Sequence, residues 1–348
     1  MFSLDKLLRD NIRKAEAYSS ARDEYEGSEG IFLDANENSL GSVTDPPYHR
    51  YPDPLQRPLK EVIAAIKRAD VKNIFLGNGS DEPIDLIIRM VCKPGIDNII
   101  IMPPTYGMYQ VSAAINDVEV KKVPLSDDFQ IRTEAVLEAA DEHTKIIFIC
   151  SPNNPTGNSL KVKDIEEVLN KFNGLVVIDE AYIDFSRHIG FVPRLKEFPN
   201  LVILQTLSKA WGMAALRLGM AYASEEIISV FNKIKPPYNI NGASQSIALE
   251  GLRKVLSKEM MVEQILTERE RLKDNLQGLP VVVKIFPSDA NFLLVKTTGG
   301  KAVYEFLIER KIITRDRSSV VLCEGCLRIT VGTPDENDKL ISALKEYK

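Results

Sequence analysis

The residues LVILQTLSKAWGMAALRLGMAYA (201–223) hold two apolar runs of strand length, 201–206 and 218–223, joined by a connection that carries Ser208, Lys209 and Arg217. Working outward, five more apolar runs of this length stand between residues 74 and 179, separated by segments with helical periodicity. Uninterrupted apolar strands that alternate with helices are typical of a parallel sheet covered on both faces. The pattern therefore predicts an α/β fold with a mixed, mostly parallel central sheet and helices on both faces.

The domain organisation follows from what flanks this region. Residues 1–30 predict a helical N-terminal arm that packs with the small domain, and IFLDANENS (31–39) predicts a short strand and a turn. A Pro-rich segment closes a large domain, residues 31–235. A long helical stretch at about 241–277 then leads into strands and a helix, which predict a smaller α+β domain over residues 236–348.

Composition excludes several classes of function. The 348 residues carry a net charge of −5, which argues against a nucleic-acid partner held by bulk charge. The charged N-terminus lacks the apolar core of a signal peptide, and no run of 18 apolar residues exists, so neither export nor a membrane span is expected. The four cysteines fit a reducing cytoplasm, and the pair Cys323-x-x-Cys326 lacks a second pair to complete a metal site.

Histidine is scarce, because His49, His143 and His188 are the only three in the sequence. A histidine-rich metal cage is therefore not expected, and a Ser-His-Asp hydrolase would have to use one of these three. We expect no metal, and we expect the chemistry to come from Lys, Arg, Asp, Asn and Tyr or from a cofactor.

Polar groups gather where the apolar runs end, which is the edge of an open α/β sheet at which ligands bind. Asn78-Gly79-Ser80-Asp81 leads from a strand into a helix, and the free backbone N–H groups of such a helix start form an anion site. A capped helix start without a ligand explains these residues equally well. The spacing fits neither the G-x-G-x-x-G turn of dinucleotide sites nor a P-loop.

Three further candidates follow other strands, and each has a plain structural alternative. Tyr106 could stack on a flat cofactor or pack in the core, and Asn154 could bond a phenolic oxygen or build a turn. Asp179 ends a wholly apolar strand, where a buried charge needs a cationic partner, although a helix N-cap is the alternative. Tyr182 follows it by three residues.

The connection between the two runs quoted first carries the strongest signal. Thr206, Ser208 and Lys209 close its first strand, and an amine among apolar residues has a lowered pKa and becomes nucleophilic. Arg217 lies within an otherwise apolar run and favours an anion such as phosphate.

Two arginines complete the set, although Arg328 on its own could be an ordinary edge-strand arginine. Arg315 precedes it by 13 residues. An anion site, an acid, an amide, an aromatic plate, a reactive lysine and arginines are together what pyridoxal phosphate (PLP) requires. The lysine forms a Schiff base, and the carboxylate keeps the pyridine nitrogen protonated so that the ring accepts electrons.

On these residues the chain resembles the fold-type I PLP-dependent aminotransferases, and among them the histidinol-phosphate aminotransferase family. The resemblance covers nearly the whole chain and implies a homodimer with shared active sites. Its motifs are YPDP (51–54), GNGSDE (77–82), PPTYGMY (103–109), CSPNNPTG (150–157), VIDEAYIDF (177–185), TLSKAWGMAALRLG (206–219) and CLRITVGT (326–333).

The resemblance implies a role for each candidate, with Lys209, Asp179 and Tyr182 as the catalytic residues. Lys209 would hold PLP, Asp179 would pair with the pyridinium N–H, and Asn154 and Tyr182 would bond the phenolic oxygen. Tyr106 would stack on the ring. The remaining cofactor contacts, chiefly to its phosphate, would come from Ser80, Asp81, Thr206, Ser208, Arg217 and, across the dimer, Tyr51.

The implied reaction converts L-histidinol phosphate and 2-oxoglutarate into imidazole acetol phosphate and L-glutamate in histidine biosynthesis. Arg328, Arg315, Tyr18 and Asn154 would contact the substrate. Threonine-phosphate decarboxylase and an aromatic amino acid aminotransferase are the alternatives on the same scaffold. A PLP-binding regulator usually carries a fused DNA-binding domain, and this acidic chain has only about 30 residues before its DANEN segment.

Overall fold

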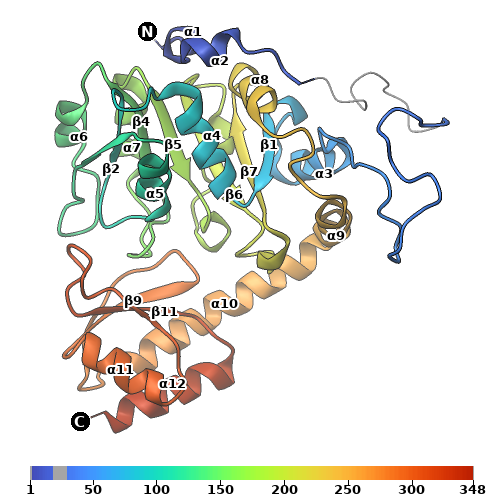
Figure 1. The fold of residues 1–348 in the computed structure, drawn as a ribbon. Coiled ribbons are helices and arrows are strands. Elements are labelled where there is room, and N and C mark those ends of the chain that lie inside the picture. Colours follow the sequence, from blue (N-terminus) through green and yellow to red (C-terminus); the bar gives the residue numbers. More distant parts are fainter. Residues whose placement is uncertain (1, 19–29, 348) are drawn as a thin grey trace.

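The computed structural model describes residues 2–18 and 30–347. A large domain is built on a seven-stranded sheet and a smaller domain on a four-stranded sheet, and the long helix α10 (Val255–Leu276) runs from one to the other (Figure 1). Among the described residues, no helix is both long and apolar enough to cross a membrane.

The central sheet has the strand order β1-β7-β6-β5-β4-β2-β3, and β7 is the one strand that runs against the others. Every apolar run that predicted a strand in the large domain forms one, which confirms the mixed, mostly parallel sheet. The strands are β1 (Ile74–Asn78), β2 (Asn98–Ile101), β3 (Glu119–Lys122), β4 (Thr144–Cys150), β5 (Leu175–Asp179), β6 (Leu201–Thr206) and β7 (Leu218–Ala223).

The antiparallel strand follows from the connection between β6 and β7, which contains no α-helix. A parallel neighbour requires a crossover that usually carries a helix, whereas the 11 residues 207–217 contain only the 3-10 turn η5 (Ala214–Leu216). β7 therefore folds back along β6, with Thr206 opposite Gly219. This return holds the polar loop between the two strands at the carboxyl end of β6.

Helices cover both faces of the sheet, as the sequence predicts, because successive strand residues point to opposite sides. One face packs against α4 (Asp81–Val91), α5 (Met108–Ile115) and α8 (Glu225–Ile234). The other packs against α3 (Arg57–Lys67), α6 (Thr133–Ala139), α7 (Val162–Lys171) and α9 (Gly242–Leu252). The short 3-10 turns η2 (Val71–Asn73), η3 (Ile183–Phe185) and η4 (Val192–Arg194) lie in the connections.

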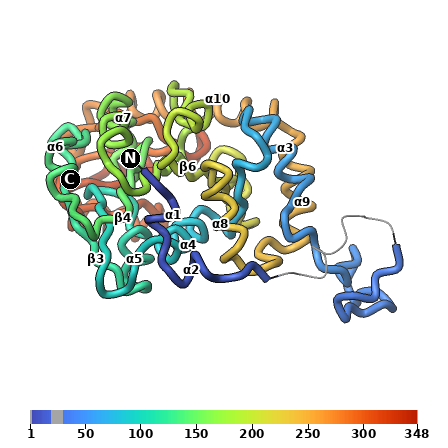
Figure 2. Tube along the Cα trace, turned by 90° about the horizontal axis from the view of Figure 1, so that it is seen from above, coloured from blue at the N-terminus to red at the C-terminus, as the bar shows by residue number. Residues whose placement is uncertain are grey.

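The N-terminal helices α1 (Leu4–Leu7) and α2 (Asp10–Lys14) lie on the large domain, across α4 and α8 (Figure 2). Leu4 is buried in the same core cluster as these helices, and Arg9 Nη1 donates to the Arg89 carbonyl (2.9 Å). The expectation that the arm packs with the small domain is therefore wrong, because its apolar side chains find their partners on α4 and α8. The rest of the expected arm, residues 19–29, lies outside the described residues.

The small domain carries an antiparallel sheet of order β10-β11-β9-β8, backed by α10, α11 (Lys301–Glu309) and α12 (Pro334–Glu346). Thr333 and Glu336 form a capping box that starts α12. The strands are β8 (Val282–Ile285), β9 (Phe292–Thr297), β10 (Arg315–Asp316) and β11 (Cys326–Thr330).

Two expected features of the sequence differ in the structure. The helical stretch near 241–277 is two helices, and Ala248 and Leu252 of the first are buried in the large-domain core, so the chain leaves that domain along α10 rather than at residue 236. Residues 31–39 form no strand, because no strand among the described residues pairs with them to supply hydrogen bonds.

Candidate active site

A cavity of about 650 Å³ opens at the carboxyl ends of the parallel strands, where loops of the large domain face β10 and β11 of the small domain. The structure thus brings together side chains from most of the length of the chain. The predicted residues that line this cavity are Ser80, Asp81, Tyr106, Asn154, Asp179, Tyr182, Thr206, Ser208, Lys209, Arg217, Arg315 and Arg328.

Lys209 stands in the loop between β6 and β7. The Ser208 N–H donates to Thr206 Oγ1 (3.1 Å), which holds the start of this loop at the strand end. The amine lies 5.6 Å from the centre of the Tyr182 ring and is accessible from the cavity. Burial by the cavity walls, and then the positive charge of Arg328, lower the pKa of this amine. A lowered pKa raises the neutral, nucleophilic fraction, as the sequence predicts.

Asp179 ends β5 and is buried beside the cavity. Its Oδ2 accepts a hydrogen bond from the Tyr109 hydroxyl (2.7 Å), and its Oδ1 accepts one from the Ala181 N–H (3.0 Å). Burial raises the pKa of Asp179 to about 6, although both hydrogen bonds oppose the rise. Tyr109 is itself held by stacking on Phe148 at 4.6 Å. A cation next to Asp179 would favour the ionised carboxylate.

The start of α4 meets Arg217 at one end of the cavity. Gly219 lies so close to the preceding turn that a Cβ there would stand 2.4 Å from the Gly79 carbonyl carbon, and the Gly79 N–H donates to the Arg217 carbonyl (2.8 Å). A Cβ on Gly79 would stand 2.6 Å from the Arg217 guanidinium. These glycines therefore allow the helix start and the guanidinium to share one anion site. Within it, Arg217 Nη2 lies 3.5 Å from Asp81 Oδ2.

Three further predicted groups line the same cavity. The Tyr106 hydroxyl donates to Asp81 Oδ1 (3.1 Å), which anchors the ring at the cavity wall. Asn154 Oδ1 accepts a hydrogen bond from Arg328 Nη1, and this leaves the amide N–H groups of Asn154 available as donors. Tyr182 is buried, and burial raises the pKa of its hydroxyl, so it is a neutral donor.

Arginines gather where the small domain lines the cavity. Arg315 on β10 lies directly across from Arg328 on β11, and like charges in that position destabilise a sheet unless an anion lies between them. The Arg328 guanidinium also stands 5.3 Å from the centre of the Phe292 ring. Within the described residues, neither arginine has an ion-pair partner. This end of the cavity therefore suits an anionic group.

Sequence reasoning missed two residues of this site, Tyr109 and Arg317. Tyr109 comes three residues after Tyr106, a spacing that puts both on one side of a helix start. Arg317 lines the cavity and comes two residues after Arg315, a spacing that puts both on one face of an extended segment. Both spacings indicate that the two residues share a face, but each spacing is equally typical of residues that only pack in the core or lie on the surface.

Two predicted residues lie outside this cavity. Tyr18 lines a separate cavity of about 450 Å³ together with Pro54 and Lys235. Tyr51 is half exposed, and its ring stacks on that of Tyr238 at 4.5 Å. Within one chain the structure does not bring either tyrosine to Lys209.

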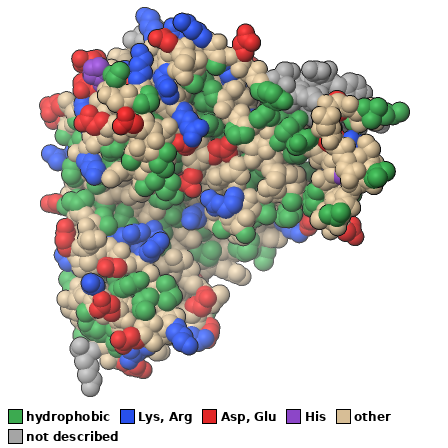
Figure 3. All heavy atoms as spheres, viewed as in Figure 1, with side chains coloured by type: hydrophobic (Ala, Val, Ile, Leu, Met, Phe, Trp, Pro, Cys, Tyr) green, Lys and Arg blue, Asp and Glu red, His purple; other side chains and the backbone are tan. Residues whose placement is uncertain are grey.

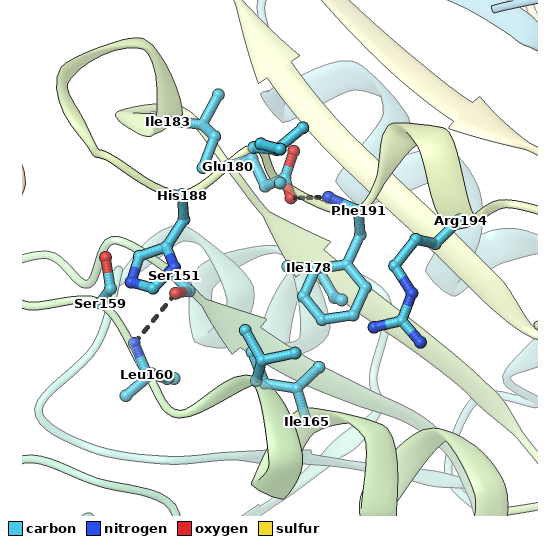
Figure 4. A pocket seen from close by; sticks show the side chains of 13 residues that line it. Ser151, Ser159, Leu160, Ile165, Ile178, Glu180, Ile183, His188, Phe191 and Arg194 are labelled. Atoms are coloured by element: carbon cyan, nitrogen blue, oxygen red, sulfur yellow. Dashed lines mark hydrogen bonds between the residues drawn. The ribbon is translucent and has the colours of Figure 1, made fainter.

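A second, smaller pocket of about 90 Å³ lies next to the site and holds Glu180, the neighbour of Asp179 (Figure 4). Its carboxylate accepts hydrogen bonds from the Phe191 N–H (2.7 Å) and from Gln205 Nε2 (2.9 Å). Gly190, at φ +79°, allows the loop to close over it, since a Cβ there would lie 2.8 Å from the carboxylate oxygens. Burial raises the pKa of Glu180 to about 7.

Comparison with known proteins finds relatives that match this chain over nearly its whole length. The sequence model of the family described as aminotransferase class I and II matches residues 26–344. A histidinol-phosphate aminotransferase from Cytophaga hutchinsonii is 60% identical over 346 residues, 99% of either chain, and one from Parabacteroides distasonis is 53% identical over the full length of both. The solved histidinol-phosphate aminotransferase from Clostridium acetobutylicum has a TM-score of 0.79 at 26% identity, over 86% of this chain and 90% of that chain.

Proposed function

The chain belongs to the class I and II aminotransferases, and from this premise we propose that it converts L-histidinol phosphate and 2-oxoglutarate into imidazole acetol phosphate and L-glutamate. One observation carries the proposal: a single cavity holds a lysine amine, a buried carboxylate, an anion site and a group of arginines that have no ion-pair partner among the described residues. The relatives that share most of this sequence bear the name of this activity.

The donor set fits PLP as the cofactor. Burial raises the pKa of the Asp179 carboxylate, and a pyridinium N–H next to it would lower that pKa again. Lys209 supplies the amine that would hold the cofactor. The helix start of α4 and Arg217 form the anion site that suits its phosphate. When bound, PLP supplies an aldehyde that condenses with amines and a ring that accepts electrons.

The residues around the cofactor would orient it and move protons. Lys209 Nζ, with its lowered pKa, is the base that would take a proton from the substrate Cα and return it. The free amide N–H groups of Asn154 and the neutral hydroxyl of Tyr182 are donors for the phenolic oxygen. Tyr106, anchored by its hydrogen bond to Asp81, would lie against the ring.

Arg315 and Arg328 would bind the anionic end of the substrates. A guanidinium binds a carboxylate or a phosphate through two parallel hydrogen bonds, so the same pair can serve both histidinol phosphate and glutamate. An anion between the two arginines would also relieve their repulsion across the β10–β11 pair.

We propose a homodimer with shared active sites. Figures 1 and 2 show that the segment after residue 30 protrudes from the body, and Figure 3 shows hydrophobic side chains on it. Ile31, Leu33 and Leu40 are at least 83% exposed, which a second copy would cover. Tyr51 follows this segment and Tyr18 lies outside this chain's cavity, so their predicted roles would be played in the site of the second subunit.

The dimer predicts complementation between inactive chains. Mixing Lys209→Ala with Tyr51→Ala subunits would create one site with both residues intact, so activity would rise above that of either variant. Additive activities and a monomeric mass by light scattering would exclude shared sites.

The activity itself is tested with the purified enzyme and PLP. Glutamate should form from 2-oxoglutarate when histidinol phosphate is added. Release of CO₂ from phosphothreonine without glutamate formation would instead indicate a threonine-phosphate decarboxylase.

For location we propose the cytoplasm, where free thiols persist, because all four cysteines are free and buried.

A further inference from the structure

A third arginine stands at the substrate end of the cavity and has no assigned role. Arg317 follows β10, and its N–H donates to the Cys326 carbonyl (2.9 Å), which keeps its backbone beside β11. Its side chain lines the cavity together with those of Arg315 and Arg328. Three guanidinium groups therefore converge on one end of the cavity.

Within the described residues, Arg317 lacks the carboxylate partners that several other arginines have. Its Nε is buried with no hydrogen-bond partner, and no carboxylate of the described residues lies within ion-pair distance. Arg194 and Arg271, by contrast, each contact two carboxylates. Asp316, its neighbour in sequence, accepts a hydrogen bond from the Ser318 N–H (2.8 Å).

Burial and the nearby charge of Arg315 lower the pKa of Arg317. A buried polar group without a partner costs free energy, so this guanidinium is arranged for an acceptor that enters the cavity. A fold that needed Arg317 only for stability would be expected to pair it with a carboxylate.

We propose that Arg317 is a specificity-determining residue that, with Arg315 and Arg328, selects a phosphate dianion over a carboxylate at this end of the cavity. The inference rests on the proposed function, because it names how that site prefers a phosphorylated amine. A carboxylate has two oxygens in one plane and is satisfied by one guanidinium fork. A phosphate monoester carries a charge of about −1.5 to −2 and three terminal oxygens, so it can use a third arginine.

The test compares Arg317→Gln and Arg317→Lys with the wild-type holoenzyme, and Arg310→Gln serves as the matched control. Arg310 is an exposed arginine of the same domain that lies over Phe306, away from the cavity. The first half-reaction is measured with histidinol phosphate and with glutamate. We expect Arg317→Gln to raise the KM for histidinol phosphate about 10- to 100-fold, because the substrate loses a charge-assisted hydrogen bond.

The other parameters separate selectivity from general damage. The kcat of Arg317→Gln and its KM for glutamate should stay within about threefold of wild type, since one guanidinium fork satisfies a carboxylate. Arg317→Lys should recover part of the loss because it restores the charge without the fork. An unchanged KM for histidinol phosphate, or equal losses with both donors, would overturn the proposal.

A binding measurement keeps this result independent of turnover. Inorganic phosphate is titrated into each holoenzyme by calorimetry, and its Kd should rise about 10-fold in Arg317→Gln but not in Arg310→Gln. If wild-type enzyme used glutamate but not histidinol phosphate, the proposed function would fail while this titration still decided the role of Arg317. Equal phosphate affinity in all variants would overturn that role.

Discussion

Asp179 ends β5 and Glu180 follows it directly, yet their side chains line two different cavities. Each is buried, each accepts two hydrogen bonds, and burial raises the pKa of each carboxylate. Their local chemistry is therefore nearly the same. The two cavities differ in the charges that surround these carboxylates.

The cationic side chains near Glu180 form ion pairs with carboxylates of the same chain. Lys67 contacts Asp184 at 3.3 Å, and Arg194 contacts both Glu166 and Glu197. In the large cavity, Lys209 and the arginines at the substrate end have no carboxylate in ion-pair contact within the described residues. The comparison teaches that a buried acid alone does not mark a site, whereas a buried acid among unpaired cations does.

The largest expected effect comes from removing the amine of the large cavity. Lys209→Ala should abolish transamination, a loss of about 10³-fold or more, and also the visible absorbance of a lysine-bound cofactor. Thermal unfolding of the apoenzyme should change little, because Lys209 makes no ion pair in the described chain. A variant that keeps both activity and absorbance would break the assignment of this cavity.

The two neighbouring acids offer a matched pair. Asp179→Asn should lower kcat on the order of 100- to 1000-fold, because the charge that favours a protonated ring nitrogen is lost. Glu180→Gln should keep kcat within about threefold, since its side chain faces the other pocket. Steady-state kinetics of both variants at pH 8 checks this, and similar losses from both would erase the distinction between the cavities.

Glu180 should instead govern stability as the pH changes. The folded protein holds the proton of Glu180 up to about pH 7, whereas the unfolded chain loses it near the ordinary value of 4.5. The folded state therefore binds more protons in this window, and this contribution to stability falls as the pH rises from about 4.5 to 7. Glu180→Gln should remove this pH dependence, which amounts to up to about 3 kcal/mol of the free energy of unfolding between these pH values.

The measurement is chemical unfolding of both proteins at pH 5 and pH 8. Gln205 can turn its amide so that Oε1, which has no partner in the described structure, accepts from the new glutamine. Glu180→Gln should therefore fold, with its largest gain over wild type at pH 8. A stability difference that does not vary with pH would contradict this role for Glu180.

Tyr109→Phe should produce the smallest effect. The hydroxyl of Tyr109 stabilises ionised Asp179, so its removal raises the pKa of that acid above its present value of about 6. Cofactor affinity should fall about fivefold to tenfold at pH 6.5, as expected for one hydrogen bond, and less at pH 8, where Asp179 is ionised in both proteins. Titration of the apoenzymes with PLP at both pH values measures this, and an equal loss at both would point to lost packing instead.

Much of the fold and site could be predicted from local sequence. Apolar runs alternating with helical periods predict the parallel sheet, and polar residues at their ends predict Lys209, Asp179 and Arg217 together. This succeeds because the carboxyl ends of parallel strands lie at one edge, so residues distant in sequence meet by topology alone. The family resemblance added the reaction, which the comparisons support.

Tertiary structure decided what depends on contacts between elements. Apolar periodicity predicts that the N-terminal helices bury one face, but only the fold places Leu4 against α4 and α8. A short segment that begins with apolar residues, such as IFLDANENS (31–39), becomes a strand only where a partner strand exists to pair its backbone.

The same limit applies inside the site. Arg315 and Arg317 were equally visible in the sequence, and Asp179 and Glu180 stand side by side. Sequence by itself determined the strands, the loop that carries Lys209 and the set of charged residues available for chemistry. Only the packed structure decided which charges are paired and which are left facing a cavity, because pairing depends on distances between segments that the order of residues does not contain.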